Sequence, residues 1–457
     1  METKTGIFYS ARKMIASYIK AGNPLIIATV LALVVANLPV VSEYYANLWN
    51  YPVRLQIGDF NLFSHGGHPM NLKDFINDAL MAVFFFSIGL EIKREVLVGE
   101  LSSVKKALLP IIAACGGMIV PVVIFYALSQ GTDYSRGCAI PMATDIAFSL
   151  GVLAMLGNRV PISLKIFLTT LAVADDIGGI LVIATCYSSD IDYMNLLWSA
   201  VAIAVLIIGG KMRVHSKSFY LLIGIVVWYL FLNSGVHATI AGVIVAFCLP
   251  AKPVYNPQKY IQIIRDSISN FHKEDDANFD KSDKEKNILT KIQMDWLKRI
   301  EAASDKVISP LQDLEDSLTP IVTYFIIPLF AFANAGIELG GMSISDVYSG
   351  VSLAIICGLF FGKFIGIFSF TWLSIKLGLT PMPAKSNWKM ISAVSMLGGI
   401  GFTVSLFIAN LSFPDAAHFD LLNSSKLGIL LGSLISGFVG YFMLKWLLPK
   451  TPFNEEC

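Results

Sequence analysis

Residues 162–187 read Ile162-SLKIFLTTLAVADDIGGILVIATC-Tyr187, an apolar stretch interrupted near its middle by two consecutive aspartates, Asp175 and Asp176. A helix of about 20 apolar residues crosses the hydrocarbon core of a bilayer, so the stretch predicts a transmembrane helix. Each aspartate at that depth costs about 2.5 to 3.5 kcal/mol on insertion scales. Permanently protonated carboxyl groups that hold helices together are one alternative, but Asn or Ser would do this at lower cost. The pair therefore predicts a protein that moves cations or protons across a membrane.

The composition is also that of a membrane protein. Of the 457 residues, 55% are hydrophobic and only 15% are charged, whereas soluble proteins have about 25% charged residues. The six cysteines form no CxxC or Cys/His cluster, which argues against disulfides and structural zinc. We expect a transporter rather than an enzyme, with no cofactor and no nucleic-acid partner.

Apolar runs recur along the chain and predict an all-α polytopic membrane protein with about 12 transmembrane helices. The runs lie near residues 24–41, 77–97, 107–129, 138–156, 162–187, 195–210, 219–234, 237–250, 318–337, 351–378, 389–411 and 425–448. With a cytoplasmic N-terminus, few of the 34 Lys and Arg residues lie in outer loops, namely Arg54, Lys73, Arg136 and Lys426. The positive-inside rule therefore predicts that both termini are cytoplasmic.

The runs divide the chain into two membrane regions separated by a polar insertion. Residues 1–250 contain eight predicted spans, a short N-terminal arm and an external hairpin at 45–64, and residues 318–457 contain four spans and a C-terminal tail. The insertion, 251–317, is predicted to be a charged cytoplasmic loop with an amphipathic helix over Leu289-TKIQMDWLKRI-Glu301. The Gly58-Asp59 turn signal predicts the hairpin. An exposed two-stranded hairpin is marginally stable alone, so we expect it to pair with its twin in a homodimer.

Two predicted spans, the fourth and the eleventh, contain helix-breaking residues at their centres. The fourth reads Gly137-CAIPMATDIAFSLGVLAM-Leu156, and the eleventh reads Met390-ISAVSMLGGIGFTVSLFI-Ala409. Proline removes a helix donor and glycine weakens a helix, so both spans are predicted to be discontinuous. A matched pair of interrupted spans points to the binding site of a transporter built from inverted repeats. Residues 145–151 and 401–407 share a weak sequence echo that agrees with such repeats.

Two further charged residues, Asp145 and Lys363, lie inside predicted spans. Half-helices have partial charges of about +0.5 at the N-terminus and −0.5 at the C-terminus, so buried ions of opposite sign stabilise them. Asp145 follows Thr144 at the first break, and Lys363 lies mid-span in Gly358-LFFGKFIGIF-Ser369. A snorkelling lysine is the alternative for Lys363, but the residue lies far from either end of its span. Both charges are therefore predicted to compensate helix dipoles.

Four segments carry the motifs of one transporter family. They are Asn77-DALMAVFFFSIGLEIKREVLVGEL, Ala143-TDIAFSLGVLAMLGNRVPISLKIFLTTLAVADDIGGI, Phe330-AFANAGIEL and Gly399-IGFTVSLFIA. Together they resemble the NhaA-type sodium/proton antiporter family, from the second span to the end of the membrane region. The resemblance implies an electrogenic, pH-regulated exchange of cytoplasmic sodium, and also lithium, for external protons in a bacterial inner membrane. It also implies inverted repeats, for which this family is a known example.

The resemblance implies roles for individual residues as well. Asp176 matches the principal carrier of the ion and the proton. Asp175 matches its neighbour, which either shares this load or pairs with the lysine at Lys363, so the implied sodium site is at Asp175 and Asp176. Asp145 and Thr144 match the break in the first discontinuous helix, close to the ion path.

A second set of residues matches the pH-response region at the family's cytoplasmic funnel. The set consists of Asp78, Glu91, Arg94, Glu95 and His237. Glu91, Arg94 and Glu95 are spaced to lie on one helix face and form an ion-pair cluster, and an interfacial salt-bridge patch is the alternative. The histidine could equally be a simple hydrogen-bonding residue. Better known members have histidines at the start of the ninth span, where this chain has Asp316 and Thr319, so their pH set point does not carry over.

The chemistry of paired aspartates favours ion exchange over two other activities. A hard monovalent cation binds carboxylate and carbonyl oxygens, and burial beside a negative charge favours the protonated carboxyl group, so sodium and protons compete for one site. An intramembrane aspartyl protease needs its aspartates on facing helices, whereas adjacent residues point about 100° apart. A sodium-coupled symporter of an organic anion is the stronger alternative, and the cationic Lys363 argues against it.

Overall fold

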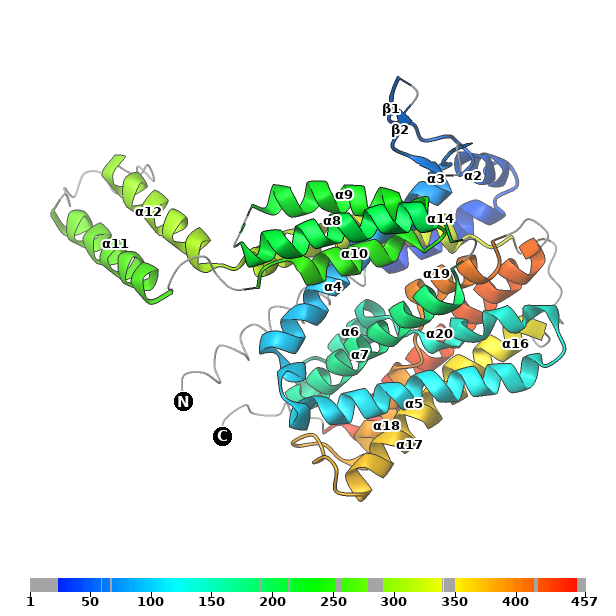
Figure 1. Ribbon diagram of the computed structural model, residues 1–457. Coiled ribbons are helices and arrows are strands. Elements are labelled where there is room, and N and C mark those ends of the chain that lie inside the picture. Colours follow the sequence, from blue (N-terminus) through cyan, green and yellow to red (C-terminus); the bar gives the residue numbers. More distant parts are fainter. Residues whose placement is uncertain are drawn as a thin grey trace.

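The computed structural model describes residues 24–449 except for 59, 66–67, 189–190, 213, 215, 252–256, 278–290, 339, 341–349 and 415–417. The predicted N-terminal arm, parts of the 251–317 loop and nearly all of the C-terminal tail lie outside the described residues. The described chain is mostly helical (Figure 1). By the length and composition of its helices, it is an all-α polytopic membrane protein.

Seven helices of the described chain are long and apolar enough to cross a membrane. Four are single elements: α5 (Val104–Ser129), α7 (Ile162–Cys186), α8 (Tyr193–Lys211) and α20 (Phe419–Leu447). Three are composite: α3 (Leu72–Asp74), η1 (Phe75–Leu80) and α4 (Met81–Val98); α13 (Pro310–Ile321), η5 (Val322–Ile326) and α14 (Ile327–Asn334); and α16 (Gly350–Cys357), η6 (Gly358–Gly362) and α17 (Lys363–Lys376). Two shorter apolar helices are α9 (Lys217–Leu232) and α10 (Ala238–Cys248).

Three pairs of helices are sharply bent at short breaks. Pro24–Asn37 and α2 (Ser42–Leu48) meet at 117°, η3 (Asp133–Met142) and α6 (Ile146–Met155) at 46°, and α18 (Trp388–Leu397) and α19 (Phe402–Ser412) at 44°. The second and third bends coincide with the helix-breaking residues of the fourth and eleventh predicted spans.

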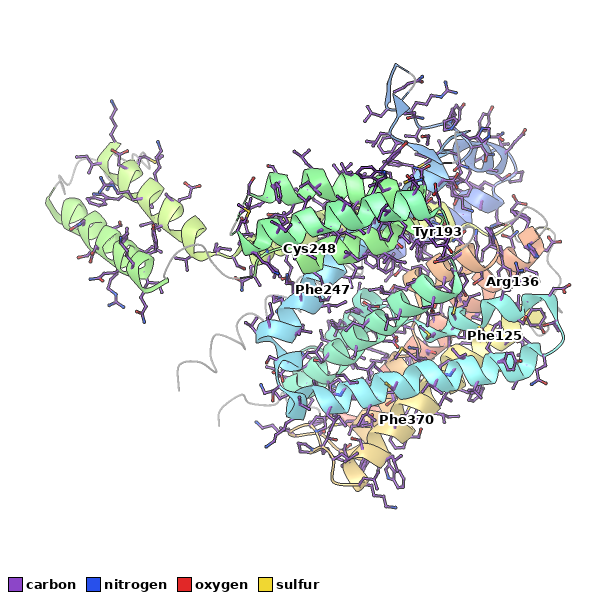
Figure 2. All side chains as sticks on the ribbon, in the orientation of Figure 1. Phe125, Arg136, Tyr193, Phe247, Cys248 and Phe370 are labelled. Atoms are coloured by element: carbon purple, nitrogen blue, oxygen red, sulfur yellow. The ribbon has the colours of Figure 1, made fainter. Side chains whose placement is uncertain are left out.

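Apolar side chains divide the bundle into two packed groups. In the first group α4 packs against α10, α10 against α9 and α9 against α8. In the second group α5 packs against α17 and α7, while α16, α18 and α19 pack against α20. The first group lies beside the second in Figure 1, and Figure 2 shows side chains filling the spaces between the ribbons. Each group therefore has an apolar core of its own, and polar residues that lie between the two groups are candidates for a functional site.

Within the second group, α5 and α17 approach closely at two glycines. A Cβ atom on Gly116 would lie 2.3 Å from the carbonyl oxygen of Gly366, and one on Gly366 would lie 2.1 Å from that of Gly116. Only glycine fits at such a contact, and small residues are typical where membrane helices pack tightly. The contact holds the start of α17, which begins at the fully buried Lys363, against α5.

The loop between α2 and α3 contains two short β-hairpins. The strands are β1 (Gln56–Ile57) with β2 (Phe60–Asn61) and β3 (Ser64–His65) with β4 (His68–Pro69), both antiparallel. Gly58 turns the first hairpin with a φ of +60°, so the hairpin predicted there is confirmed, while the second is not predicted. The predicted boundaries of 45–64 are wrong at the start, because residues 45–48 belong to α2. Tyr45 anchors that helix by donating its hydroxyl to the carbonyl oxygen of Phe332 at 2.5 Å.

Residues 251–317 contain more helix than the sequence predicts. α11 (Pro257–Ala277) and α12 (Lys291–Val307) pack against each other and project away from the bundle (Figure 1). α12 contains most of the predicted amphipathic helix, whereas the polar composition of α11 is also typical of a solvated linker. The predicted boundary between residues 317 and 318 is wrong, because the helix that contains the ninth predicted span begins at Pro310. Ser309 caps it, with its Oγ accepting from the backbone amide of Gln312 at 3.2 Å.

Candidate functional site

The fourth predicted span is interrupted between η3 and α6. Ala143 and Asp145 have extended backbone conformations there, and α6 begins after Asp145. The Asp145 carboxylate caps α6, because its Oδ1 accepts from the backbone amide of Phe148 at 2.9 Å. Aspartate is favoured at this position since it pairs with a free amide and with the positive end of the helix dipole.

The break between α18 and α19 lies directly against this first break. The backbone amide of Asp145 donates to the carbonyl oxygen of Ile400 at 2.7 Å, and the hydroxyl of Thr144 donates to that of Gly398 at 2.9 Å. A Cβ atom on Gly399 would lie 2.4 Å from a backbone carbonyl oxygen of η6, so glycine is needed at this crossing. The backbone groups freed by the two breaks thus bond each other inside the protein, as irregular backbone at membrane depth requires.

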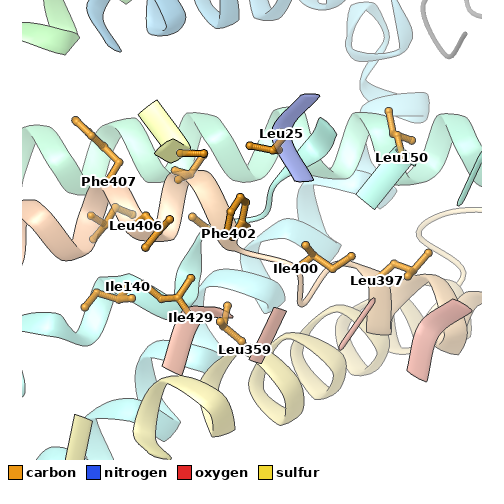
Figure 3. Packing of buried hydrophobic residues seen from close by; sticks show 14 of the residues in the cluster. Leu25, Ile140, Leu150, Leu359, Leu397, Ile400, Phe402, Leu406, Phe407 and Ile429 are labelled. Atoms are coloured by element: carbon orange, nitrogen blue, oxygen red, sulfur yellow. The ribbon is translucent and has the colours of Figure 1, made fainter. Parts of the chain in front are cut away.

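Buried apolar side chains enclose the crossing (Figure 3). Two serines tie the halves together through reciprocal hydrogen bonds. Ser149 of α6 donates to the carbonyl oxygen of Leu397 at 3.1 Å, and Ser405 of α19 donates to that of Ile140 at 2.8 Å. Each bond joins the helix after one break to the helix before the other, so the two interrupted spans form one unit.

The Asp145 carboxylate lies at the N-termini of both helices that follow the breaks. Its Oδ2 accepts from the backbone amide of Thr403 at 3.1 Å and from the Thr403 hydroxyl at 2.7 Å, in the first turn of α19. Ser433 of α20 completes this cap, because its Oγ accepts from the amides of Gly401 and Phe402 at 3.2 Å each. One buried negative charge therefore faces two positive helix ends.

Lys363 provides the positive charge of the site. Its Nζ lies 2.6 Å from Oδ2 of Asp175 and donates to the Thr144 hydroxyl at 2.9 Å. The Lys363 and Asp175 side chains are 0% and 1% exposed, so this ion pair is dry. Because Thr144 in turn donates to Gly398, the ammonium group is linked to the carbonyl at the end of α18, which is a negative helix end.

The two aspartates of α7 have different surroundings. Asp175 is held by Lys363, and its Oδ1 is buried without a hydrogen-bond partner in the part of the chain that is described. Asp176 instead lines a cavity of about 80 Å³, together with Asp145 and Thr144. That volume holds several water molecules. Asp176 is therefore the aspartate that faces the cavity, while Asp175 offers a free carboxylate oxygen next to it.

The cavity lies between the two helix groups, and its lining is part polar and part apolar. Its polar residues come from α4, α7, α13, η5 and α19 and from the first break: Ser87, Glu91, Thr144, Asp145, Asp176, Glu315, Thr319, Thr323 and Thr403. Among the described residues no three His, Cys, Asp or Glu side chains gather to hold a metal ion. A cation at Asp176 would therefore be bound by one or two carboxylates with hydroxyl, carbonyl and water oxygens, which suits a hard monovalent ion.

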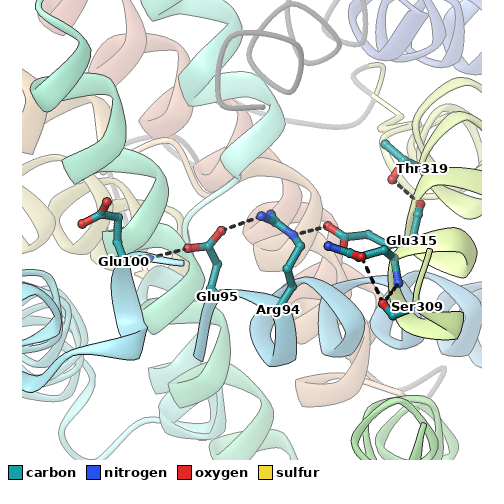
Figure 4. Close-up of polar contacts among 7 residues, drawn as sticks. Arg94, Glu95, Glu100, Ser309, Glu315 and Thr319 are labelled. Atoms are coloured by element: carbon teal, nitrogen blue, oxygen red, sulfur yellow. Dashed lines mark hydrogen bonds and ion pairs between the residues drawn. The ribbon is translucent and has the colours of Figure 1, made fainter. Parts of the chain in front are cut away.

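An ion-pair cluster borders this cavity (Figure 4). Arg94 of α4 pairs with Glu95 at 3.0 Å and, through its Nε, with Glu315 of α13 at 2.8 Å. Glu315 and Glu91 both line the cavity, so the cluster is continuous with the polar path to Asp176. These side chains are 12% to 18% exposed in the two pairs, unlike those of the dry pair.

Two residues of the predicted pH-response set lie apart from this cluster. Asp78 is in η1, thirteen residues before Glu91 on one continuous helix. Asp78 therefore lies about 20 Å along the helix from Glu91, and its role in the pH response stays a prediction. His237 precedes α10, where its Nδ1 is 3.1 Å from the Thr239 hydroxyl and its ring meets that of Phe407 edge-on at 5.5 Å. The local hydrogen bond matches the simpler of the two interpretations of this histidine.

Several residues of the site are not singled out by the sequence. Glu315 and Thr403 are partners of Arg94 and Asp145, and Ser433 caps α19 from a distant helix. Thr403 carries a weak signal, because a hydroxyl residue just after a glycine-rich break is typical of a helix start. Of the two residues predicted to replace family histidines, Thr319 lines the cavity and Asp316 is exposed.

Comparison with known proteins gives one consistent result. The sequence model of the family described as Na+/H+ antiporter 1 matches residues 12–444. The Na(+)/H(+) antiporter NhaA of Phocaeicola vulgatus is 53% identical over 451 residues, which cover 98% of both chains. That of Bacteroides fragilis is 55% identical over 433 residues, 94% of this chain and 96% of the relative. That of Helicobacter pylori is 43% identical over 443 residues, 97% of both.

Proposed function

This chain belongs to the Na+/H+ antiporter 1 family, and on that premise we propose that Asp176, with Asp175, carries the sodium ions and protons that it exchanges. The protein is a sodium/proton antiporter, a multi-pass membrane transporter whose substrates are sodium and protons. The assignment of the carrier rests chiefly on one observation: of the two aspartates, Asp176 lines the cavity while Asp175 holds Lys363.

Exchange follows from competition at these carboxylates. Sodium binds to the ionised oxygens, whereas burial and the neighbouring negative charge favour the protonated form. Because both species occupy the same oxygens, loading one displaces the other. When only a loaded site changes sides, sodium cannot move one way without protons moving the other.

Lys363 links the binding of a cation or proton at Asp175 to the point where the two broken helices cross. Its ammonium group forms an ion pair with Oδ2 of Asp175, so a cation or proton that binds this oxygen competes with the ammonium group. The lysine also donates to Thr144, at the first break, so a change at Asp175 alters the contacts of the crossing. Two carboxyl groups and one amine can thus take up or release protons against one sodium ion, which supports an electrogenic exchange.

We assign the pH response to the cluster at the cavity. Glu91, Arg94 and Glu95 of α4 and Glu315 of α13 place three negative charges and one positive charge along the path to Asp176. Protonation of any of these carboxylates changes the field at the site and hence its affinity for cations. For the separate residues Asp78 and His237, the family resemblance alone supports a role.

The topology that we propose has twelve spans and two inverted repeats. Seven long helices, three bent pairs and two short apolar helices supply the spans. Two reciprocal contacts support the repeats: Gly116 against Gly366, and the paired bonds of Ser149 and Ser405 across the breaks. The distribution of Lys and Arg supports an orientation with both termini, α11 and α12 in the cytoplasm. The bacterial relatives support a location in a bacterial inner membrane. A homodimer through the β1–β2 hairpin completes the proposal.

The test of the carrier is proton flux in everted membrane vesicles from a host without its own antiporters. Respiration acidifies the interior, and sodium, lithium or potassium is then added at several pH values. We expect sodium to collapse the gradient in the wild type and in the control variant Asp420→Asn, whose carboxylate is exposed at the start of α20. We expect no collapse in Asp176→Asn.

Sodium-dependent proton movement that persists in Asp176→Asn would show that another group carries the ion. Failure of every cation to collapse the gradient, from inserted wild-type protein, would reopen the organic-anion symporter alternative. That alternative is not favoured at present, because the named relatives are sodium/proton antiporters. Uptake of a labelled organic anion would distinguish the two.

A further inference from the structure

A second, apolar groove lies beside the broken helices. Its volume is about 510 Å³, and it is lined by the Pro24–Asn37 helix, α6, the first residue of α19 and α20. This volume is within the range of about 300 to 1,000 Å³ that is typical of ligand sites. The lining is almost wholly apolar or aromatic, and its polar contributions are the hydroxyl groups of Thr29, Ser433 and Tyr441. An apolar occupant is therefore favoured over a polar one.

The groove is about as long as one leaflet is deep. Along α20 its lining extends from Leu430 to Phe442, which is about 18 Å of helix at about 1.5 Å per residue. Half of a hydrocarbon core of about 30 Å is about 15 Å. An acyl chain that stands upright in one leaflet would therefore lie along the whole groove.

Basic and aromatic side chains mark the headgroup level at one end of the groove. The Nζ atom of Lys445 lies 5.7 Å from the ring centroids of both Tyr441 and Phe442, which line the groove. Trp446 is 92% exposed, as expected of an aromatic residue at the membrane–water interface. A basic residue at this level attracts anionic lipid by about 1 kcal/mol. The tail site and a matching positive charge are therefore adjacent.

We propose that this groove binds one anionic phospholipid from the cytoplasmic leaflet, with an acyl chain between α20 and the Pro24–Asn37 helix and the headgroup at Lys445. The leaflet follows from the orientation proposed above, in which the C-terminal end of α20 is cytoplasmic. The binding itself does not depend on which residues carry sodium, so it is tested separately from the exchange.

The deep end of the groove touches the cap of the second broken helix. Phe402 and Ser433 line the groove, and Ser433 accepts the amides of Gly401 and Phe402. The next residue, Thr403, donates to Asp145 at the crossing. A bound acyl chain therefore packs on the residues that hold α19 in place beside the ion site, and its loss is expected to lower the apparent sodium affinity.

Binding is measured by native mass spectrometry of the full-length protein titrated with phosphatidylglycerol or phosphatidylcholine that have the same acyl chains. Two pairs of variants isolate the groove. Val30→Trp places a large side chain at a residue that lines the groove, and Leu31→Trp places the same side chain at the neighbouring residue, which does not line it; the two residues are 53% and 50% exposed. Lys445→Ala removes the headgroup contact, and Lys376→Ala removes a similar lysine that stacks on Trp372 at the end of α17.

We expect one tightly held phosphatidylglycerol in the wild type, Leu31→Trp and Lys376→Ala. It should be lost in Val30→Trp and weakened about fivefold in Lys445→Ala, the factor that corresponds to about 1 kcal/mol. Equal retention by all five proteins would overturn the site. Equal affinity for phosphatidylcholine would overturn the headgroup assignment, and dimer dissociation in Val30→Trp would mean that a second copy of the chain covers the groove.

Transport in proteoliposomes tests the consequence for the ion site. With phosphatidylglycerol present, the apparent sodium affinity should be higher than in phosphatidylcholine alone for the wild type and Lys376→Ala. In Lys445→Ala this difference should shrink. A lipid dependence that is the same in Lys445→Ala and the wild type would show that it arises elsewhere.

Discussion

The Asp175–Lys363 pair and the Arg94–Glu315 pair are both ion pairs between helices, with contacts of 2.6 and 2.8 Å, yet their surroundings differ sharply. The first is 0% and 1% exposed, and the second is 18% and 15% exposed beside the cavity. A dry pair that loses one partner leaves a buried charge without compensation, whereas a partly solvated pair is screened and contributes little. The dry pair is therefore expected to be essential for the stability of the broken-helix site, whereas the partly solvated pair is expected to adjust the pH response of transport.

Removing the charge of Lys363 is expected to have the largest effect. Lys363→Met keeps most of the side-chain volume and leaves Asp175 buried and unpaired, so the free energy of unfolding should fall by about 3 to 5 kcal/mol. Chemical denaturation of the detergent-solubilised protein measures this change. Lys376→Met, at the other end of α17, is the matched control and should change stability by less than about 1 kcal/mol. Equal stability of both variants would mean that the dry pair is not essential to the fold.

The capping contacts of Asp145 should have an intermediate effect. Asp145→Ala removes the cap of both α6 and α19, so we expect a loss of about 1 to 2 kcal/mol for each helix end. Thr403→Val removes only the hydroxyl bond to Asp145 and should cost about 1 kcal/mol. Thermal unfolding of the two variants side by side tests this order. A larger loss in Thr403→Val would contradict the view that the carboxylate holds both helix ends.

How far the sequence predicts this site depends on distance along the chain. The Asp175-Asp176 pair, the helix-breaking residues and the mid-span Lys363 are local signals, because the cost of a buried charge or of a glycine in a helix is a property of the residue itself. The partners Glu315, Thr403 and Ser433 are ordinary polar residues in distant segments, and only the packing of the helices brings them to the site. The sequence thus indicates which buried charges and helix ends need a partner, but it does not identify the residues that act as partners.

The fold shows the same limit. The apolar runs predict where helices lie, since each run must be long enough to cross the bilayer. The start of α13 at Pro310 and the extra helix α11 are not predicted, because their polar composition does not distinguish helix from linker. For the same reason the sequence predicts a single amphipathic helix at 289–301, whereas the structure has two packed helices, α11 and α12.

Changing the cluster at the cavity is expected to shift the pH of half-activation without loss of transport. A negative charge near the carboxylates favours retention of their protons, so Glu315→Gln should move activation to lower pH and Arg94→Ala to higher pH. Each shift should be a few tenths of a pH unit, because such pairs contribute about 0.2 to 1 kcal/mol and one unit equals about 1.36 kcal/mol. Sodium-driven proton flux against pH measures both.

High salt should shrink these two shifts, since the cluster is partly solvated. Glu100→Gln is the control, because Glu100 pairs with Lys106 at 3.5 Å and does not line the cavity. Shifts of the same sign in Glu315→Gln and Arg94→Ala would show that the cluster does not act through its charge.

The smallest effect is expected at Asp316 and Thr319, the two residues predicted to replace family histidines. Thr319 lines the cavity, so an imidazole there lies on the path to Asp176 and adds a positive charge when it is protonated, near pH 6.5. Thr319→His should therefore weaken apparent sodium affinity at pH 6 more than at pH 8, by about twofold or less. Asp316 is exposed, so Asp316→His should change the profile less than Thr319→His, because solvent and salt screen its charge from the site. A larger effect of Asp316→His than of Thr319→His would mean that exposure does not decide which residues of this helix influence the pH profile.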